Sequence, residues 1–372
     1  MLIGVPKEIK NHEYRVGMTP GAVREAIAHG HSVIVETNAG AGIGQDDDAY
    51  RAVGAKICGV AGDVYSKAEM IVKVKEPQPV ECRMLREGQL LFTYLHLAPD
   101  PAQTELLQQS GCTAIAYETI TDASGGLPLL APMSEVAGRM ATQVGACSLQ
   151  KANGGSGVLL GGVPGTHAAK VTVVGGGVVG TNAARMALGL GAEVTILDKS
   201  LPRLRYLDDL FGPMLKTRYA TLDSLEELIL EADMVVGAVL VPGAAAPKLV
   251  SRDMLGMMKS GSVLVDVAID QGGCFETSKA TTHADPTYIV DDIVHYCVAN
   301  MPGAVAKTST FALNNATLPF TLALADKGWQ QACADDLHLL EGMNIHAGKV
   351  TYRAVAEALD KEYAPADEVL AA

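Results

Sequence analysis

A glycine-rich turn in the middle of the chain has the residue types and spacing of a phosphate-binding loop. Gly175, Gly177 and Gly180 directly follow an apolar run at residues 171–174, and Asp198 closes the next apolar run. The first glycine permits a tight turn, the second lets the backbone approach a pyrophosphate, and the third lets the following helix lie close to the sheet. A carboxylate about 20 residues later can accept hydrogen bonds from a ribose diol. The spacing therefore predicts a dinucleotide-binding site.

The same spacing could arise by chance, because the chain contains 39 glycines and a bare G-x-G-x-x-G can lie in a flexible loop. Here the strand pattern before it, the alanine-rich helical pattern from Thr181 to Leu190 and the acid at its expected distance agree with one another. A free 2′-phosphate would meet the like charge of Asp198, so we expect NAD as the cofactor. Lys199, which follows that acid, keeps NADP open as an alternative.

Four ionisable residues could supply chemistry beside such a cofactor. Arg15, Lys75, His96 and Asp270 each follow a predicted strand, and ligands of open α/β sheets bind beyond the carboxyl ends of the strands. Arginine can bind a carboxylate through two hydrogen bonds, lysine can donate to a carbonyl oxygen, and histidine can exchange a proton near neutral pH. An aspartate can accept from an ammonium group or a water. Together these residue types favour hydride transfer to or from the carbon of a small carboxylate substrate.

Each of these four residues also has a purely structural interpretation. An arginine in a polar loop is most often a solvated surface charge, and a lysine at a strand end usually extends to water, with Lys73 as a competitor of Lys75. A single histidine is more often packed or exposed than catalytic. Asp270 could cap a turn, and Asp266 is a competing carboxylate. None of the four residues supports a functional assignment alone.

Short apolar runs rich in β-branched residues alternate with helical patterns, as is typical of parallel α/β sheets. We expect two Rossmann-like, doubly wound α/β domains joined by two long helices, with an inter-domain cleft. The substrate-binding domain is expected to be discontinuous, with residues 1–130 and 307–372, and the NAD-binding domain to comprise residues 131–306. The predicted strands are Leu2 to Val5, Ser32 to Glu36, Met70 to Val74, Leu90 to Leu95, Thr113 to Tyr117, Val171 to Val174, Glu193 to Leu197, Met234 to Val239, Ser262 to Val267 and Tyr288 to Val290.

Several helices have recognisable boundaries. Thr19-Pro20 and Asp100-Pro101 each place an N-cap residue before a proline at the first helical position. The two long helical patterns run from about Ser134 to Lys151 and from about Ala304 to Lys327.

Composition limits the class of protein. The 372 residues are 48% hydrophobic and 5% aromatic, enough for two domains with aliphatic cores. A formal charge of −13 argues against nucleic-acid binding. Seven scattered cysteines form no metal or disulfide pattern, and no segment is a membrane span. We expect a cytoplasmic protein that binds neither nucleic acid nor membrane.

Eight motifs extend these observations over essentially the full length. At these residues the sequence resembles the alanine dehydrogenase family, which is related to the NAD(H)-binding domain of pyridine nucleotide transhydrogenases. The motifs are Gly4-Val-Pro-Lys-Glu, Glu13-Tyr-Arg-Val-Gly-Met-Thr-Pro20, Val72-Lys-Val-Lys-Glu-Pro77, Thr93-Tyr-Leu-His-Leu-Ala98, Ala131-Pro-Met-Ser-Glu-Val-Ala-Gly-Arg139, the glycine loop, Val265-Asp-Val-Ala-Ile-Asp-Gln-Gly-Gly273 and Val298-Ala-Asn-Met-Pro-Gly-Ala304.

The resemblance implies NAD-dependent, reversible oxidative deamination of L-alanine to pyruvate and ammonia. It implies that Arg15 and Lys75 hold the substrate, that His96 and Asp270 are the acid/base groups, and that the chain forms a homo-oligomer, a hexamer. The cofactor contacts expected from the glycine loop and from the resemblance are Ser134, Gly175, Gly177, Val178, Val179, Gly180, Asp198, Arg203, Val239, Leu240, Val267, Ala268, Ile269, Asp270, Val298, Ala299, Asn300 and Met301.

The sequence departs from the family pattern at two positions, and it lacks a metal-binding pair that some members carry. Position 203 is commonly lysine and is Arg203 here, which keeps the charge. Position 220 is Ala220, where a serine side chain contacts the cofactor in some members, so we leave it out of the site. Some members carry a metal-binding Glu and His on the late long helix, but residues 318–327 offer no matching pair, so we expect no metal.

Two other functions are compatible with a dinucleotide site. The chain could be a non-catalytic nucleotide module that docks on a proton-pumping transhydrogenase, but this reading needs a partner with membrane helices. It could also be an opine or saccharopine-type dehydrogenase that acts on a bulkier substrate. Substrate size depends on the orientation of apolar residues such as Tyr94, Met133 and Met301.

Overall fold

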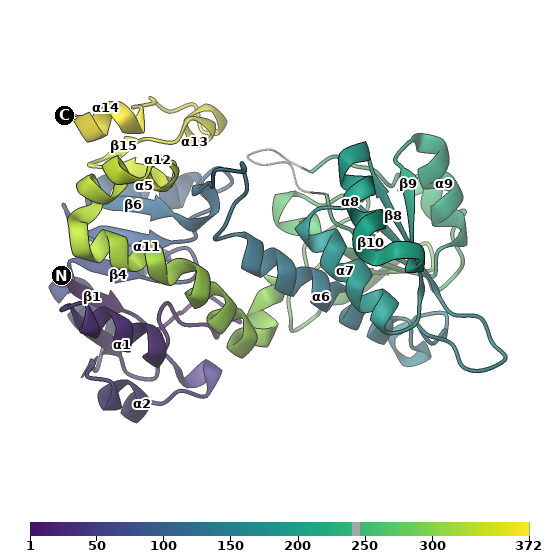
Figure 1. Cartoon of the computed structure of the whole chain (residues 1–372), viewed down its shortest axis with the longest axis horizontal. Coiled ribbons are helices and arrows are strands. Elements are labelled where there is room, and N and C mark those ends of the chain that lie inside the picture. The colour runs from purple at the N-terminus through teal and green to yellow at the C-terminus, as the bar shows by residue number, and fades with distance from the viewer. Residues whose placement is uncertain (240–245, 372) are drawn as a thin grey trace. The chain divides into compact units, whose positions relative to one another are not determined.

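The chain folds into two compact units in the computed structural model, which describes residues 1–239 and 246–371. Unit 1 consists of Met1–Met133 and Gly303–Ala372, and unit 2 consists of Ser134–Pro302. In Figure 1 the colours follow the chain out of unit 1, through unit 2 and back. The chain passes into unit 2 within helix α6 (Ala131–Ser148) and returns just before helix α11 (Ala306–Asp335).

Unit 1 is built on an eight-stranded sheet with the order β15-β14-β6-β5-β4-β1-β2-β3 among the described residues. The strands β1 to β6 are parallel, and their order reverses between β1 and β4, as in a doubly wound sheet. Strand β14 pairs antiparallel with β6 and carries β15 at the edge. The strands are β1 Leu2–Val5, β2 Ser32–Glu36, β3 Lys56–Cys58, β4 Met70–Val72, β5 Leu90–Thr93, β6 Thr113–Ala116, β14 Met343–His346 and β15 Lys349–Val350.

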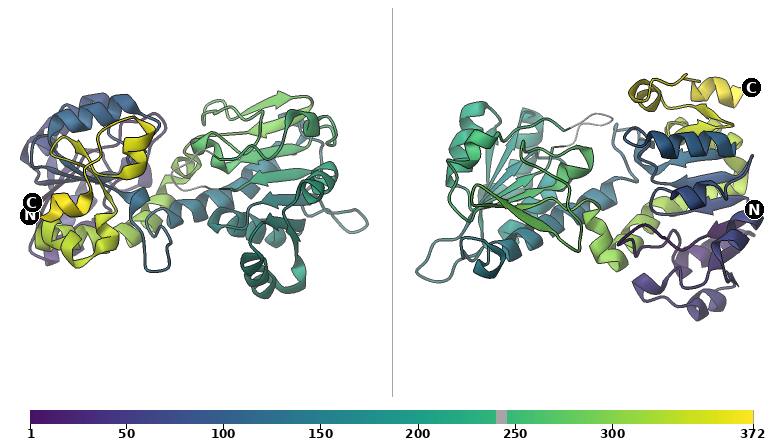
Figure 2. Two further views of the ribbon diagram at one scale, coloured as in Figure 1. Left: turned by 90° about the horizontal axis from the view of Figure 1, so that it is seen from above. Right: turned by 180° about the vertical axis from the view of Figure 1, so that it is seen from behind.

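Helices cover both faces of this sheet. Figures 1 and 2 show α1 and α11 on one face and α5 on the other. The expected N-caps are confirmed, because Thr19 Oγ1 accepts from Ala22 N at 3.2 Å and Asp100 Oδ1 accepts from Gln103 N at 3.0 Å. The helices of unit 1 besides α11 are α1 Pro20–Ala28, α2 Asp47–Ala52, α3 Ala61–Lys67, α4 Pro79–Cys82, α5 Pro101–Ser110, α12 Leu337–Leu340, α13 Arg353–Ala358 and α14 Ala366–Ala371.

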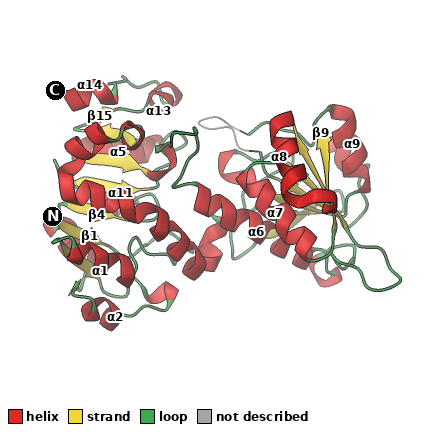
Figure 3. Ribbon diagram, viewed as in Figure 1, coloured by secondary structure: helices red, strands yellow, loops and turns green. Residues whose placement is uncertain are grey.

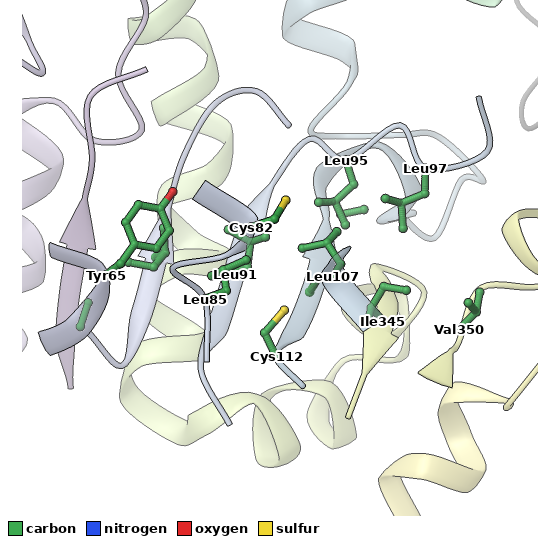
Figure 4. Packing of buried hydrophobic residues seen from close by; sticks show 14 of the residues in the cluster. Tyr65, Cys82, Leu85, Leu91, Leu95, Leu97, Leu107, Cys112, Ile345 and Val350 are labelled. Carbon is green, nitrogen blue, oxygen red and sulfur yellow. The ribbon is translucent and has the colours of Figure 1, made fainter. Parts of the chain in front are cut away.

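The core of unit 1 joins its two chain segments. Figure 4 shows Leu91, Leu107 and Cys112 from the first segment packed with Ile345 from the second. All four side chains are fully buried, and each large aliphatic side chain buried in this way contributes about 1.5–3 kcal/mol. On the other face, Asn314 of α11 accepts a hydrogen bond from Thr19 N at 2.7 Å. The C-terminal segment therefore also fixes the loop that leads into α1.

Unit 2 has a seven-stranded sheet with the order β12-β13-β11-β10-β7-β8-β9 among the described residues. Its parallel part, β9-β8-β7-β10-β11-β13, repeats the doubly wound order, with the reversal between β7 and β10. Among the described strands of this sheet, only β12 is antiparallel, and it pairs with β13. The strands are β7 Lys170–Val174, β8 Glu193–Asp198, β9 Leu215–Tyr219, β10 Met234–Gly237, β11 Val263–Asp266, β12 Thr287–Val290 and β13 Ile293–Tyr296. The prediction of two doubly wound α/β domains is confirmed.

Two glycines let α6 pack closely inside unit 2. A Cβ atom at Gly145 would lie 2.1 Å from Met234 Sδ, and one at Gly138 would lie 2.2 Å from Val179 O. The alternation of strands and helices is visible in Figure 3. The other helices of unit 2 are α7 Val178–Gly189, α8 Leu201–Phe211, α9 Leu222–Glu231 and α10 Arg252–Leu255. Among the described residues, no helix is both long and apolar enough to cross a membrane.

Candidate functional site

Arg15 lies in the loop after β1 and is only 2% exposed. Glu13 holds its guanidinium group, because Arg15 Nε donates to Glu13 Oε1 at 2.7 Å and Nη2 donates to Glu13 Oε2 at 2.5 Å. Arg15 Nη1 also contacts Met133 Sδ at 3.1 Å. Burial alone would lower the pKa of Arg15, but the hydrogen bonds and charge of Glu13 raise it. The guanidinium group is therefore charged and held in one orientation by a carboxylate that the sequence analysis missed.

The two lysines after β4 have different environments. Lys73 is fully buried, with Nζ 3.0 Å from Glu8 Oε2 and 2.7 Å from Glu81 Oε1. The side chain of Lys75 is 10% exposed, and its Nζ lies 3.6 Å from Glu76 Oε2. Lys73 thus forms ion pairs with two buried carboxylates. Of the two lysines, Lys75 is the one with partial access to solvent.

Glu8 connects this buried ion group to the end of β4. Its Oε1 accepts hydrogen bonds from Val74 N at 2.7 Å and from Lys75 N at 3.3 Å. Its Oε2 accepts a hydrogen bond from the ammonium group of Lys73. Burial raises the pKa of Glu8, and the charge of Lys73 opposes that rise. Because Glu8 follows β1, this carboxylate fixes the carboxyl ends of β1 and β4 relative to each other.

His96 follows β5 in a tight turn with φ of 51°, a left-handed conformation that costs free energy for a residue with a Cβ atom. Glu118 stabilises the turn, because its Oε1 accepts from His96 N at 2.6 Å and from Leu95 N at 3.1 Å. The Nδ1 atom of His96 lies 3.9 Å from the same carboxylate. The His96 ring is parallel to the ring of Tyr94, with centroids 5.8 Å apart. The sequence did not identify Glu118 as a site residue. It follows β6, however, and ligands of open α/β sheets bind beyond the carboxyl ends of the strands.

These three predicted residues meet at one edge of one sheet. Arg15, Lys75 and His96 follow β1, β4 and β5, which are consecutive neighbours in the sheet. The charges of Lys75 and His96 both act on Glu76, and the charge of Arg15 acts on Tyr94. The structure of unit 1 therefore brings together three of the four predicted chemical groups.

The glycine loop of unit 2 connects β7 to α7 at the point where the strand order reverses. Gly175 has φ of 102°, and a Cβ atom at Gly180 would lie 1.8 Å from Gly175 O. A Cβ atom at Gly177, the N-cap of α7, would meet no described atom within 4 Å. The loop therefore needs its first and third glycines for its own geometry, and its second leaves the helix N-terminus open to a phosphate group. These residues fit the pyrophosphate of a dinucleotide.

Asp198 and Arg203 both hold the glycine loop. Asp198 Oδ2 accepts from Gly176 N at 2.7 Å, and its Oδ1 accepts from Ser200 N at 2.8 Å. Arg203 Nε donates to Gly176 O at 2.5 Å, and its Nη2 donates to Thr181 Oγ1 at 2.7 Å. Each carboxylate oxygen has a second lone pair, so Asp198 can also accept hydrogen bonds from a ribose diol.

The structure distinguishes the two aspartates after β11. Asp266 is fully buried and accepts from Ala268 N at 3.1 Å and from Cys274 N at 2.8 Å. Burial raises its pKa, while a hydrogen bond from Ser278 opposes that rise. Asp270 lies in the exposed part of the following 3-10 helix, Val267–Gln271. Asp266 therefore stabilises the segment, and Asp270 is the aspartate that is exposed to solvent.

The other predicted cofactor residues lie on several segments of unit 2. Ser134 is half-buried in the first turn of α6, and Val178 is 41% exposed in the first turn of α7, next to Val179. The group Val267, Ala268 and Ile269 forms the 3-10 helix before Asp270, and Val298, Ala299, Asn300 and Met301 follow β13. Val239 accepts a weak hydrogen bond from Cys274 Sγ, and Leu240 lies outside the described residues. Within residues 1–239 and 246–371, no cluster of His, Cys, Asp or Glu side chains could hold a metal ion.

The fold and the site together define the class of protein. Unit 2 is a doubly wound α/β domain whose glycine loop fits a dinucleotide, and unit 1 carries charged groups at the carboxyl edge of its own doubly wound sheet. Two family models match, described as "Alanine dehydrogenase/PNT, N-terminal domain" over residues 4–137 and "Alanine dehydrogenase/PNT, C-terminal domain" over residues 141–353. The chain belongs to the alanine dehydrogenase/PNT family, which confirms the resemblance drawn from the motifs.

Individual relatives agree with this assignment. The chain is 65% identical over 370 residues to the alanine dehydrogenase of Halomonas elongata, with 100% of both chains covered. A solved structure of an L-alanine dehydrogenase matches with a TM-score of 0.93 and 51% identity, over 97% of this chain and 99% of that chain. A transhydrogenase from Sinorhizobium meliloti matches with a TM-score of 0.81 and 25% identity, over 95% of this chain and 100% of that chain.

Proposed function

We propose that this chain is an oxidoreductase that catalyses the reversible, NAD-dependent oxidative deamination of L-alanine to pyruvate and ammonia. The observation that carries the proposal is the placement of Arg15, Lys75 and His96 after three neighbouring strands of unit 1. These groups provide what an amino-acid dehydrogenase needs, namely cations for a carboxylate and a carbonyl oxygen and a group that exchanges protons. The identity of 65% over the full length to an alanine dehydrogenase supports the choice of substrate.

Each of the proposed catalytic groups has a defined role. Arg15, oriented by Glu13, binds the substrate carboxylate, and Lys75 donates a hydrogen bond to the carbonyl oxygen of pyruvate. A bound nicotinamide would supply the hydride acceptor for the α-carbon of alanine, and the hydride donor in the reverse direction. Water adds to the resulting iminium, and His96 and Asp270 move the protons that allow the carbinolamine to release ammonia.

Unit 2 is the proposed NAD-binding domain, and unit 1 is the proposed substrate-binding domain. The glycine loop and Asp198 support binding of the pyrophosphate and the adenosine ribose, while Ser134, Val178 and Val179 extend the contact surface. The remaining proposed contacts are Arg203, Val239, Leu240, Val267, Ala268, Ile269, Asp270, Val298, Ala299, Asn300 and Met301. Assembly as a homohexamer in the cytoplasm is also proposed from the family resemblance, and light scattering would test the assembly.

The proposal predicts a specific effect of removing the histidine. His96→Ala should bind NADH nearly as well as the unsubstituted protein, while its turnover falls by about 100-fold to 10,000-fold because proton transfer is lost. NADH absorbance with pyruvate and ammonium measures turnover, and NADH fluorescence measures binding. His167→Ala, which changes an exposed histidine in unit 2, is the matched control and should keep full activity. Comparable turnover in both variants would contradict the assignment of His96.

The same assay separates the alternative functions. A dehydrogenase for bulkier substrates would oxidise NADH faster with larger 2-oxo acids or with amino-acid co-substrates than with pyruvate and ammonium. A non-catalytic nucleotide module would bind NADH without oxidising it under either condition. Absence of ammonium-dependent NADH oxidation by the unsubstituted protein would refute the proposed function.

A further inference from the structure

Glu76 lies directly beside the proposed substrate-binding lysine. It follows Lys75 at the carboxyl end of β4, and its side chain is 12% exposed. Lys10 Nζ, from the loop after β1, donates a hydrogen bond to Glu76 Oε1. One oxygen of this carboxylate is therefore held by a cation from a neighbouring segment.

The other oxygen, Oε2, lacks a hydrogen-bond donor among the described residues. Glu76 Oε2 is buried and accepts no hydrogen bond from the described residues. The nearest cation recorded for it, Lys75 Nζ, lies 3.6 Å away, which is beyond normal hydrogen-bond range. Leaving a buried acceptor unpaired is unfavourable, and more so when it carries charge, so such an atom requires an explanation. Two other buried side-chain atoms in the described part of the chain, on Ser156 and Gln271, also lack a partner, but both are neutral and lie in unit 2.

The carboxylate of Glu76 is charged at neutral pH. Burial alone would raise the pKa of Glu76, but the charges of Lys75, Lys10 and His96 lower it to about 2. A carboxylate with so low a pKa holds no proton at neutral pH and is a weak base. It can accept hydrogen bonds from a cationic donor, but it is poorly suited to proton transfer.

The other carboxylates at this edge are already engaged. Glu8 accepts hydrogen bonds from Lys73 and the backbone, Glu13 from Arg15, and Glu118 from the backbone of the turn at His96. An amino acid differs from its 2-oxo acid by an ammonium group on the α-carbon, and that group needs an anionic acceptor. Glu76 Oε2 is the available acceptor beside Lys75 among these four carboxylates.

We propose that Glu76 binds the α-ammonium group of the amino-acid substrate through Oε2 and, in the reverse direction, holds the incoming ammonium ion beside Lys75. This inference rests on the proposed function. In this arrangement Arg15 and Lys75 bind the groups that L-alanine and pyruvate share, and Glu76 binds the group that only the amino acid has. Glu76 is therefore a substrate-binding residue that distinguishes the amino acid from the oxo acid.

Steady-state kinetics of Glu76→Gln test this role. Because the variant loses one charge-assisted hydrogen bond, the KM for L-alanine and the KM for ammonium should each rise by about 10-fold to 100-fold. The KM for pyruvate should change by less than about 3-fold, because pyruvate carries no N–H donor. Glu231→Gln removes a carboxylate that pairs with Lys170 on the surface of unit 2 and should change none of the three values. Glu76→Asp, which keeps the charge, should retain part of the selectivity for ammonium.

The possible outcomes distinguish an error in the role of Glu76 from an error in the proposed function. If Glu76 only orients Lys75, the KM for pyruvate will rise as much as the KM for ammonium, and that result would overturn the inference. Unchanged constants in Glu76→Gln would overturn it as well. If Glu76→Gln does not fold, the Glu76→Asp variant decides: a preferential rise in the KM for ammonium supports the role, and equal changes for ammonium and pyruvate refute it. Failure of the unsubstituted protein to oxidise NADH with ammonium would refute the proposed function, and this inference with it.

Discussion

Replacing Lys73 by methionine tests whether the buried ion group holds the site together. Lys73 Nζ lies 3.0 Å from Glu8 Oε2 and 2.7 Å from Glu81 Oε1, and all three side chains are at most 2% exposed. Methionine fills similar space but leaves two buried carboxylates without their cation. Breaking a buried ion pair from one side typically costs about 3–5 kcal/mol, so we expect a loss of that size in the free energy of unfolding near pH 8.

The size of this loss should depend on pH. Burial raises the pKa of Glu8 above its usual 4.5 even with Lys73 present, and Lys73 opposes that rise. In the variant the pKa of Glu8 should therefore be higher still. A carboxyl group whose pKa is raised on folding stabilises the protein while it is protonated and loses that contribution as the pH rises through its folded-state pKa. The difference between the variant and the unsubstituted protein should thus shrink as the pH falls from 8 towards 5.

Urea unfolding followed by tryptophan fluorescence measures this effect with a probe that lies in unit 1. The chain has one tryptophan, Trp329 of α11, whose ring centroid lies 4.8 Å from that of His346. Lys67→Met is the matched control, because the Lys67 side chain is 56% exposed and its Nζ lies 3.6 Å from Asp63. The control should lose about 0–1 kcal/mol. Equal losses in the two variants, or a Lys73→Met defect that grows on acidification, would refute the reasoning.

Two further predictions concern the dinucleotide loop. Gly180→Ala places a Cβ atom 1.8 Å from Gly175 O, so the turn must open, and NADH affinity measured by fluorescence titration should fall at least about 10-fold. Gly189→Ala in the same helix meets no described atom within 4 Å and should leave that affinity unchanged; equal affinities in the two variants would contradict the account of the loop. Asp198→Asn removes the charge that opposes a 2′-phosphate, so the ratio of the KM for NADPH to that for NADH should fall. An unchanged ratio would show that Asp198 does not select the cofactor.

Elements formed by neighbouring residues could be predicted from the sequence. The β7–loop–α7 unit follows from its glycine spacing, and the starts of α1 and α5 follow from an N-cap residue before a proline. Two doubly wound sheets follow from the alternation of strand and helix patterns. These features depend on residues close together in the chain, so their patterns can be recognised without the fold.

Strands β3, β9, β13, β14 and β15 were not predicted from the sequence, and among them the edge strands β3 and β9 are short or polar. Strand β3 has three residues, none of them fully buried, and β9, Leu-Lys-Thr-Arg-Tyr, has one buried side chain out of five. Strand β14 pairs antiparallel with β6, more than 200 residues earlier in the chain, where Ile345 lies opposite Ala114. An edge strand buries less of its surface and lacks the apolar run that identifies a central strand.

The sequence was sufficient to predict a dinucleotide loop and a set of charged residues after strands, because residue spacing and periodicity are local properties. It left Lys73 and Lys75 as competitors, and likewise Asp266 and Asp270. The tertiary structure distinguished the members of each pair. Lys73 is enclosed by carboxylates from two other segments, and Asp266 is surrounded by donors that follow it in the folded turn. The physical reason is that a charge can be buried only where the fold supplies its partners.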